Sequence, residues 1–418
     1  MSHCTLSPTT LALAAVALAA LSGCTPMAER AATRFFRPAP DHAAKYDAAK
    51  LYPQGRIFPL GMFAGKGERD KPNGYTMLGP YGREENVADA REHGLTCTYT
   101  ISLPMKFHSK QPLKLTPAQI REKIAEQVRK AAGNPEVAWW YLKPEELRYW
   151  RKNEIEYLQV AAQAIRDTDP LKRPVWMYDP GHRAADGLAH TVRHLDICGK
   201  GMYTNYSGMR DSRIWVRWTI EQEIEAIRRA NPSAVPIAVP EMFQQSPDEL
   251  LPMIPRWVRH DVYLSLVAGA KGIIVFSGWA RPKFPAYQAY YDAFAACARE
   301  IGGPLGLGQV FLFGERRDDL RVRVLDGPRH VTMTFHKQTR DYPSVSFLDV
   351  AFGRARYLFV VNSANEALRM RIEGLPRTPV AVEDLFTPGS RATVAEGNFE
   401  QMLEALEVNA FRLTPARR

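Results

Sequence analysis

Residues 137–166, VAWWYLKPEELRYWRKNEIEYLQVAAQAIR, contain the two patterns that decide the fold. The first residues, Val137–Leu142, form a short apolar run that is rich in aromatic side chains, which predicts a buried strand. From Glu146 to Arg166, apolar residues recur every three or four positions, which predicts an amphipathic helix. The stretch therefore predicts one strand followed by one helix, the repeating unit of an α/β protein.

The same alternation continues on both sides, from Arg56 to Ile301. We predict eight strands there, most of them followed by a helix-like stretch: Ile57–Phe63, Tyr75–Gly79, Thr96–Ser102, Val137–Leu142, Pro174–Tyr178, Ile197–Tyr203, Pro236–Val239 and Gly272–Phe276. Thr116 and Pro117 provide a cap and a first-turn proline for one of the helices. Eight such units in about 250 residues are typical of a (β/α)₈ barrel. A doubly wound open sheet is the alternative, but no GxGxxG motif follows the first strand.

The pattern changes near Gly302-Gly303-Pro304. Short alternating runs follow, separated by Gly, Pro and Asp-Gly turns; they include FLFG, LRVRVL, HVTMTF, RYLFVV, LRMRI and VAVEDLF. They predict seven or more antiparallel strands, and hence a small β-sandwich. We therefore assign the barrel, as the catalytic domain, to residues 53–303 and the sandwich to residues 304–418.

Residues 1–23 contain no Asp, Glu, Lys or Arg, and the apolar run from Leu11 to Leu21 has 11 residues. A membrane-spanning helix needs about 20 residues, so this run predicts the core of a secretory signal peptide. The next residues, Leu21-Ser22-Gly23-Cys24, resemble the lipobox of bacterial lipoproteins. An ordinary secretory signal with an incidental cysteine is the alternative.

The lipobox resemblance implies cleavage before Cys24 and attachment of fatty acids such as palmitate to that residue. Residues 24–52 would then form a lipidated tether, because they show no clear apolar period. Thr25, next to the cysteine, implies the outer membrane, with the protein facing the periplasm or the cell surface.

The chain of 418 residues has 55 Lys and Arg residues against 45 Asp and Glu, a formal net charge of +10. The basic residues form no dense run, so we expect no nucleic-acid partner. We also expect the protein to be a monomer. They are most frequent after residue 304, where they could meet lipopolysaccharide or an acidic polysaccharide. Cys97, Cys198 and Cys297 have apolar neighbours, which predicts buried thiols. No sequence motif predicts a metal site or a cofactor.

Glutamates follow two of the predicted strands. Glu145 and Glu146 come after the fourth strand and Glu241 after the seventh. In a barrel, functional side chains project from the carboxyl ends of the strands, and strands four and seven face each other. A carboxyl on each strand can therefore flank one bond. This suits glycoside hydrolysis, in which one carboxyl protonates the leaving oxygen while the other attacks the anomeric carbon or activates water.

The same strand ends carry side chains suited to binding sugars, since aromatic rings stack on the C–H faces of sugars and polar groups hold hydroxyls. The candidates are Trp140, Tyr141, Asp179, His182, Tyr203, Tyr206 and Trp279. Trp139 and Trp140 point to opposite sides of one strand, so at most one of them faces the barrel mouth. The expected partner is therefore a carbohydrate substrate.

Six stretches, FPLGMF, WWYLKPEEL, RPVWMYDP, DICGKGMYTNY, AVPEMF and GAKGIIVFSGW, resemble the strand ends of clan A glycoside hydrolases, the retaining (β/α)₈ enzymes. They are most similar to bacterial members that carry Trp-Tyr-x-x-Asp-Glu-Pro at strand four and a C-terminal β-sandwich. In that clan the acid/base glutamate follows strand four and the nucleophile follows strand seven. The resemblance therefore implies Glu145 as acid/base and Glu241 as nucleophile.

Two positions depart from that pattern. Pro144 stands where the clan has Asn or Asp, and Glu146 stands where it has Pro. The choice between Glu145 and Glu146 is therefore open, and Glu146 has the alternative role of a first-turn acid in the following helix. We expect an exported, lipid-anchored glycoside hydrolase that acts on a poly- or oligosaccharide. The alternative is a barrel that has lost catalysis and serves in glycan binding or envelope assembly.

Overall fold

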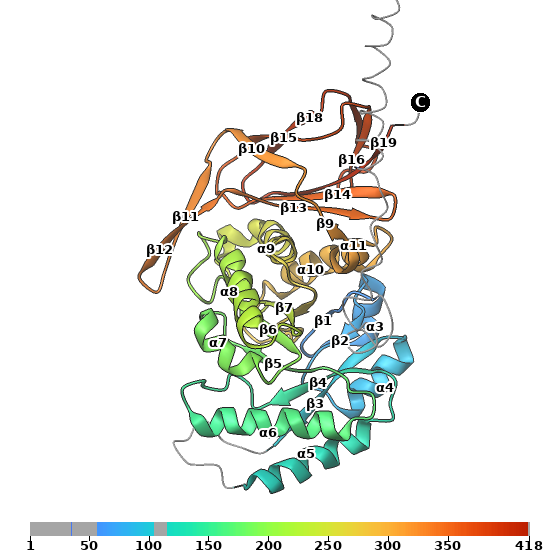
Figure 1. Cartoon of the computed structure of the whole chain (residues 1–418), viewed down its shortest axis with the longest axis vertical. Coiled ribbons are helices and arrows are strands. Elements are labelled where there is room, and N and C mark those ends of the chain that lie inside the picture. Colours follow the sequence, from blue (N-terminus) through green and yellow to red (C-terminus); the bar gives the residue numbers. More distant parts are fainter. Residues whose placement is uncertain (1–34, 36–56, 104–114, 417–418) are drawn as a thin grey trace, which may run out of the picture.

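The structure is a computed structural model that describes Phe35 and residues 57–103 and 115–416. The predicted signal peptide, Cys24 and most of the predicted tether lie outside the described residues. Within the described residues, no helix is both long and apolar enough to cross a bilayer. Figure 1 shows a barrel with its helices below and a group of antiparallel sheets above.

Eight parallel strands form the barrel, as predicted. They are β1 (Leu60–Met62), β2 (Met77–Leu78), β3 (Thr96–Ser102), β4 (Val137–Lys143), β5 (Val175–Asp179), β6 (Ile197–Met202), β7 (Val235–Pro240) and β8 (Ile273–Val275). They pair in the order β1-β8-β7-β6-β5-β4-β3-β2. The amide of Gly79 donates to the carbonyl of Met62 (3.0 Å) and so joins β2 to β1. The sheet is therefore nearly closed.

Helices follow the strands and cover the outside of the barrel. They are α3 (Gly67–Asp70), α4 (Glu84–His93), α5 (Pro117–Ala131), α6 (Lys152–Thr168), α7 (Ala185–Val192), α8 (Trp215–Ala230), α9 (Ile254–Ala268), α10 (Tyr287–Gly302) and α11 (Leu307–Phe313), with 3₁₀ turns η2 (Lys71–Asn73) and η3 (Asp248–Met253). Thr116 caps α5 as predicted, because its hydroxyl accepts a hydrogen bond from the amide of Gln119 (3.3 Å). Helix α6 begins only at Lys152, so Glu146 lies in the loop before it.

Two antiparallel sheets form the predicted sandwich. The larger one, in the order β17-β16-β19-β14-β13-β9, contains β9 (Glu315–Arg316), β13 (Val345–Phe352), β14 (Ala355–Asn362), β16 (Val380–Asp384), β17 (Arg391–Val394) and β19 (Val408–Pro415). The smaller one contains β10 (Arg321–Asp326), β15 (Leu368–Glu373) and β18 (Asn398–Leu403). Leu358, Met370 and Leu413 belong to the apolar core between them. The prediction of a strand at FLFG is wrong, because residues 311–313 end helix α11.

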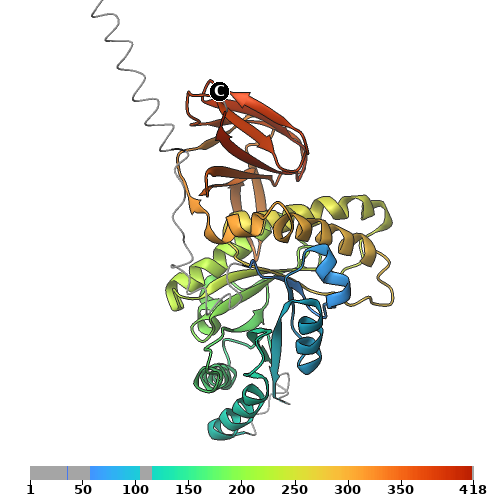
Figure 2. The ribbon, with the colours of Figure 1, turned by 90° about the vertical axis from the view of Figure 1, so that its right-hand side faces the viewer.

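The middle of the six-stranded sheet, at β14, is buried on both faces. Away from the small sheet, Phe359 and Val361 share an apolar core with the barrel helices, and the ring of Phe311 in α11 lies 4.4 Å from that of Phe359. Figure 2 shows these helices as a layer between barrel and sandwich. Because both faces are covered, β14 has an unbroken apolar run instead of a strict alternation.

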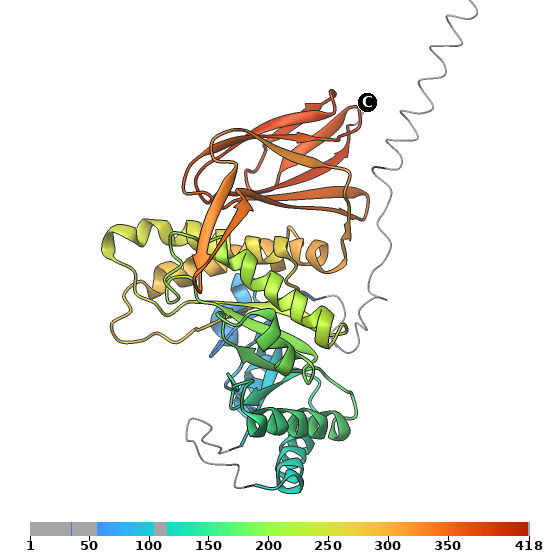
Figure 3. The same ribbon diagram turned by 60° about the vertical axis from the view of Figure 1, so that its left-hand side comes forward.

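A hairpin of β11 (His330–Phe335) and β12 (Gln338–Pro343) leaves the sandwich and reaches the barrel (Figure 3). Its turn residues, His336 and Lys337, have φ angles of 48° and 62°, as expected for a two-residue hairpin turn. The Phe335 ring lies 5.6 Å from Trp215 and 5.0 Å from Trp218 in α8. The sandwich therefore makes direct contact with the barrel side of the molecule.

Phe35 packs in the core between the two sheets of the sandwich. Its side chain is only 7% exposed. The guanidinium carbon of Arg356 lies 4.0 Å from its ring centroid, within the range of a cation–π contact. A residue that precedes the barrel in the chain thus contributes to the second domain.

The three cysteines in the barrel are buried and unpaired, as predicted. Burial raises the pKa of Cys97 and Cys297 to about 12. Since the thiolate is the reactive form, these thiols are inert at neutral pH.

Candidate active site

Side chains along β4 alternate between the inside and the outside of the barrel. Trp139 and Tyr141 point inward, since their rings lie 6.0 and 4.8 Å from the ring of Trp176 in β5. Trp140 points outward, where its indole N–H donates to Asp169 (2.9 Å) and its side chain is fully buried. The prediction that Trp140 contacts a sugar is therefore wrong, because the alternation has the opposite phase.

A cavity of 440 Å³ lies at the carboxyl ends of the strands. Most of its wall is aromatic and consists of Phe63, Tyr81, Tyr178, Tyr203, Tyr206, Phe243 and Phe276. Its polar lining side chains are Glu145, Glu146, His182 and Ser207. The structure thus brings four of the predicted site residues together, namely Glu145, His182, Tyr203 and Tyr206.

Glu145 lies partly exposed in this cavity, with one phenol bonded to each of its carboxylate oxygens. The hydroxyl of Tyr81 donates to Oε1, and that of Tyr141 donates to Oε2. Burial, together with the nearby Glu145 carboxylate, raises the pKa of both phenols, so they remain protonated donors. The ammonium of Lys143 lies 3.6 Å from the centroid of the Tyr81 ring. The two phenols therefore hold the Glu145 side chain in position, and the Lys143 ammonium packs on one of their rings.

Glu146 is exposed and lines the same cavity. Its φ angle of 58° places it in the left-handed region, which costs a residue with a Cβ atom roughly 1–2 kcal/mol. Its amide donates to the carbonyl of Tyr178 (3.2 Å), and its carbonyl accepts from Arg183 (3.0 Å). The alternative role of Glu146 as a first-turn acid is wrong, because the loop holds it apart from α6.

Glu241 follows β7 and is only 4% exposed. Its carboxylate accepts hydrogen bonds from the backbone amides of Asn205 (2.5 Å) and Tyr206 (3.2 Å), which lie in the loop after β6. Burial raises the pKa of Glu241 to about 7, although these two amides oppose the shift. Glu241 is not among the residues that line the cavity around Glu145. The two predicted catalytic glutamates therefore have different surroundings.

Tyr203 and Tyr206 belong to a cluster of rings on the β6 side of the cavity. Tyr203 stacks on Tyr178 and on Phe276, with centroids 5.6 Å apart in both pairs. Tyr206 lies 5.7 Å from Phe243 and is 68% exposed. This cluster offers ring faces and an accessible phenol to a ligand.

Two other predicted ligand-binding aromatics lie next to the cavity without lining it. Tyr141 is fully buried, and its phenol donates a hydrogen bond to the Glu145 carboxylate. Trp279 is 40% exposed and stacks on Tyr81, with centroids 5.4 Å apart and ring planes at 21°. Both residues therefore act on the site through Tyr81 or Glu145 in this conformation.

The prediction that Asp179 holds a sugar hydroxyl is wrong. Asp179 is fully buried, and its oxygens accept hydrogen bonds from Arg183 and from the hydroxyl of Thr191 in α7. Trp176 and the Tyr178 ring lie inside the barrel, so the side chain of Asp179, the next residue along β5, points toward the helices. Asp179 thus fastens α7 to the strand.

His182 lies at the rim, where the hairpin of the sandwich meets the barrel. Its carbonyl accepts a hydrogen bond from Nε2 of His336 (3.3 Å). Burial, together with the nearby Arg183 cation, lowers the pKa of His182, so its ring is neutral at pH 7. A ligand in the cavity would therefore meet an uncharged imidazole at this edge.

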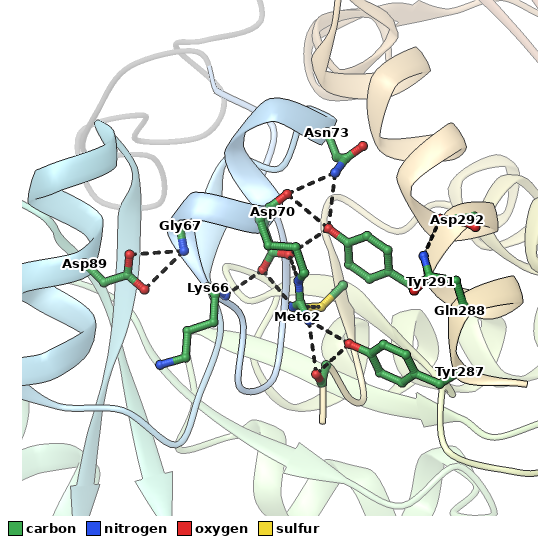
Figure 4. Close-up of polar contacts among 12 residues, drawn as sticks. Met62, Lys66, Gly67, Asp70, Asn73, Asp89, Tyr287, Gln288, Tyr291 and Asp292 are labelled. Atoms are coloured by element: carbon green, nitrogen blue, oxygen red, sulfur yellow. Dashed lines mark hydrogen bonds and ion pairs between the residues drawn. The ribbon is translucent and has the colours of Figure 1, made fainter. Parts of the chain in front are cut away.

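A polar network beside the mouth ties the loop after β1 to α10 (Figure 4). Arg69 donates to the phenol of Tyr287 (2.6 Å) and to the carbonyl of Gly278 (3.3 Å). Asp70 accepts from the backbone amide of Lys66 (2.8 Å) and pairs with Arg69 (2.7 Å). Because Trp279 follows Gly278, this network also holds the loop whose tryptophan stacks on Tyr81.

Tyr81 is the main residue that the sequence prediction missed. It follows β2, the least regular of the predicted strands, yet it bonds to Glu145, stacks on Trp279 and lines the cavity. Its position at the carboxyl end of a predicted barrel strand is the sequence feature that could have identified it as a site residue. Within the described residues, no group of three or more His, Cys, Asp or Glu side chains is placed to hold a metal ion.

No protein-family model matches this chain, and no curated protein matches its sequence. Its fold matches solved structures. The α-amylase of Geobacillus thermoleovorans, complexed with acarbose, is 10% identical at a TM-score of 0.53, over 84% of this chain and 91% of that one. A GH27 β-L-arabinopyranosidase of Geobacillus stearothermophilus is 8% identical at a TM-score of 0.53, over 88% and 98%.

A family 5 glycoside hydrolase of Bacteroides vulgatus is 13% identical at a TM-score of 0.53, over 86% of this chain and 90% of that one. The resemblance to glycoside hydrolases of this barrel type is thus found again in three dimensions. At such low identity the likeness shows the fold, a barrel with appended antiparallel sheets.

Proposed function

We propose that the chain is a glycoside hydrolase in which Glu145 is the general acid/base. The observation that carries the proposal is the position of Glu145, whose carboxylate lies in an aromatic cavity at the carboxyl ends of the barrel strands. Aromatic walls with a few fixed polar groups are typical of small-ligand sites, and ring faces suit sugars. The substrate is a poly- or oligosaccharide.

In the proposed reaction, Glu145 gives its proton to the glycosidic oxygen while the bond to the anomeric carbon breaks. The phenols of Tyr81 and Tyr141 then stabilise the resulting carboxylate, since each donates to one of its oxygens. In the second step water attacks the anomeric carbon, the bond between that carbon and the proposed nucleophile Glu241 breaks, and the Glu145 carboxylate takes a proton from the water. The two tyrosines are positioning residues that keep the reacting oxygen oriented.

Glu241 is the proposed nucleophile because of its place after β7. The backbone amides of Asn205 and Tyr206 favour its charged form, which is the form that attacks a carbon. Its exposed fraction of 4% requires the loop at Asn205 and Tyr206 to shift when a sugar binds. Attack by this carboxylate predicts retention of the anomeric configuration.

A hydrolysis screen over neutral and acidic oligosaccharides tests the proposal. We expect the wild type to release reducing ends from at least one substrate. Glu145→Gln should lower turnover roughly 10²–10⁴-fold, the usual loss for a general acid/base. Glu146→Gln is the matched control, because it removes a carboxylate from the same cavity, and it should retain most of the activity.

The outcomes separate two functions. Undiminished turnover by Glu145→Gln would overturn the assignment of Glu145, and full loss in Glu146→Gln alone would move the role to Glu146. The second candidate function is glycan binding without hydrolysis, which is favoured by the burial of Glu241 away from the cavity lining. Calorimetric binding of a glycan that the wild type never cleaves would establish that function instead.

We also propose that Cys24 carries fatty acids and holds the protein in the outer membrane, facing the periplasm or the cell surface. The lipobox Leu21-Ser22-Gly23-Cys24 supports this. Metabolic labelling with an alkynyl palmitate in a bacterial host should mark the wild type. Cys24→Ser should be unlabelled and leave the membrane fraction, whereas labelling that survives the substitution would place the lipid elsewhere.

A further inference from the structure

A second cavity, of 770 Å³, lies on the six-stranded sheet of the sandwich. Its lining comes from the turn between β13 and β14 and from strands β14, β16, β17 and β19, at the right of the upper part of Figure 1. None of its lining residues belongs to the barrel. The cavity is therefore separate from the site around Glu145, and the proposed hydrolysis assigns no role to it.

Arginines give this cavity a positive charge. Arg354, Arg391 and Arg412 line it, and its lining includes no Asp or Glu. Arg412 donates two hydrogen bonds to nearby Glu383 (3.0 and 2.7 Å), and Arg391 reaches the same carboxylate at 3.4 Å. One carboxylate thus offsets three guanidinium groups, which leaves a net of two positive charges.

Arg354 is the arginine of this cavity with the fewest polar interactions among the described residues. It lies exposed in the tight turn after β13, beside Gly353 with its φ of 59°, and it forms no ion pair with the residues that the structure describes. The side chain of Arg391 is 60% exposed and that of Arg412 is 40% exposed. All three guanidinium groups are thus accessible to a ligand from solvent.

The chemistry of the lining defines the ligand. A guanidinium group presents a planar fork of N–H donors that matches a carboxylate, sulfate or phosphate. The hydroxyls of Thr393 and Thr414 and the partly buried ring of Tyr357 complete the surface. Donors for anions beside hydroxyls and a ring suit a chain of sugars that carry acidic groups.

We propose that this cavity, which we call the arginine groove, binds an anionic polysaccharide. The argument is charge complementarity in a hollow surface: the groove has the volume of an ordinary ligand site and a net positive charge. A bound polymer would keep the protein on its substrate or matrix while the barrel acts. The inference does not depend on hydrolysis at Glu145.

The test compares two double variants by affinity electrophoresis in gels that contain polygalacturonate or neutral dextran. Arg354→Gln/Arg391→Gln removes two charges from the groove and leaves the Arg412 to Glu383 pair intact. Arg369→Gln/Arg371→Gln is the matched control, because these arginines are exposed on β15 of the other sheet and pair with Glu400. Both variants lose the same net charge.

We expect the wild type and the control to be retarded by polygalacturonate and not by dextran. The groove variant should bind at least roughly tenfold more weakly, as expected for two lost charge-assisted contacts, and added salt should weaken wild-type binding. Glu145→Gln should bind like the wild type, which separates this site from the proposed active site.

Three results would overturn the proposal. Equal weakening of both double variants would show a general effect of charge, and no retardation of the wild type would remove the site. Binding of the wild type to phosphatidylglycerol vesicles, lost in the groove variant and without binding to polygalacturonate, would make the groove a membrane contact instead.

Discussion

The glutamates that follow β4 and β7 share a residue type and a strand-end position, yet their surroundings differ. Glu145 is partly exposed and is held by the phenols of Tyr81 and Tyr141. Glu241 is 4% exposed and is held by two backbone amides of the loop after β6. Side-chain donors can move with a reacting carboxylate, whereas backbone donors tie it to the fold. The position at a strand end therefore does not by itself decide whether a carboxyl meets a ligand.

The largest expected effect is on stability. Glu241→Leu should lower the free energy of unfolding by roughly 2–6 kcal/mol, because the amides of Asn205 and Tyr206 lose their acceptor in the buried carboxylate, at about 1–3 kcal/mol each. Glu145→Leu is the comparison and should cost roughly 1–3 kcal/mol, since Tyr81 lines a cavity that water can enter and only the buried Tyr141 phenol loses its acceptor. Urea unfolding measures both. Equal losses would remove the distinction between the two carboxyls.

The next effect concerns pH. Burial raises the pKa of Glu241 from 4.5 to about 7, so between these values the folded chain binds this proton more tightly than the unfolded chain. Its contribution to stability is therefore fully present below pH 4.5 and is lost as the pH rises through about 7, a fall of up to about 3 kcal/mol. Glu241→Gln does not titrate and should lack this fall.

Urea midpoints of the wild type and of Glu241→Gln at about pH 5 and about pH 8 measure this effect, because titrations of other groups cancel in the difference. The urea midpoint of the variant should rise relative to that of the wild type as the pH rises. A difference that stays constant over this range would contradict a raised pKa at Glu241.

A smaller effect is expected at the phenols that hold Glu145. Tyr81→Phe and Tyr141→Phe each remove one hydrogen bond to a charged group, worth roughly 1.5–3 kcal/mol. We expect kcat to fall about 10–100-fold with little change in KM, because the bond stabilises the carboxylate formed during reaction. Tyr206→Phe is the control on the opposite wall and should change KM more than kcat. A KM effect alone in Tyr141→Phe would argue against its role in positioning Glu145.

The smallest effect is expected at Glu146. Glu146→Gly relieves the strain of a positive φ and should raise the free energy of unfolding by up to about 1 kcal/mol, part of the gain being offset by the flexibility of glycine in the unfolded chain. Glu146→Ala keeps the strain and serves as control. If both variants melt at the same temperature, the backbone at Glu146 is not strained in solution.

Local patterns were enough to predict the barrel. β3 was predicted with its observed bounds, Thr96–Ser102, and the cap of α5 followed from Thr116 and Pro117. The prediction of site residues failed where it depended on which side chains of a strand point into the barrel and which point outward. Trp140 and Asp179 were assigned to the cavity, but both lie outside the barrel wall, and a strand pattern with a period of two defines two faces without saying which is inner.

Packing between segments that are distant in the sequence explains two further differences between prediction and structure, the burial of Glu241 and the helix at FLFG. The burial of Glu241 depends on the amides of Asn205 and Tyr206, which are supplied by a loop far away in the sequence. The helix at FLFG reflects the apolar surface beneath it, where Phe311 meets Phe359 of the sandwich. Neither partner is visible in the local sequence, because tertiary contacts override local propensity.

The hairpin of β11 and β12 limits how the chain can be divided. Phe335 covers Trp215 and Trp218, and His336 bonds to the carbonyl of His182. A barrel cut off after residue 303 would therefore expose two tryptophans to water and lose support at the edge of its mouth. The two domains are separate in topology but share this interface, so we expect them to stabilise each other. Variation in the sandwich would then alter the shape of the barrel mouth through the hairpin.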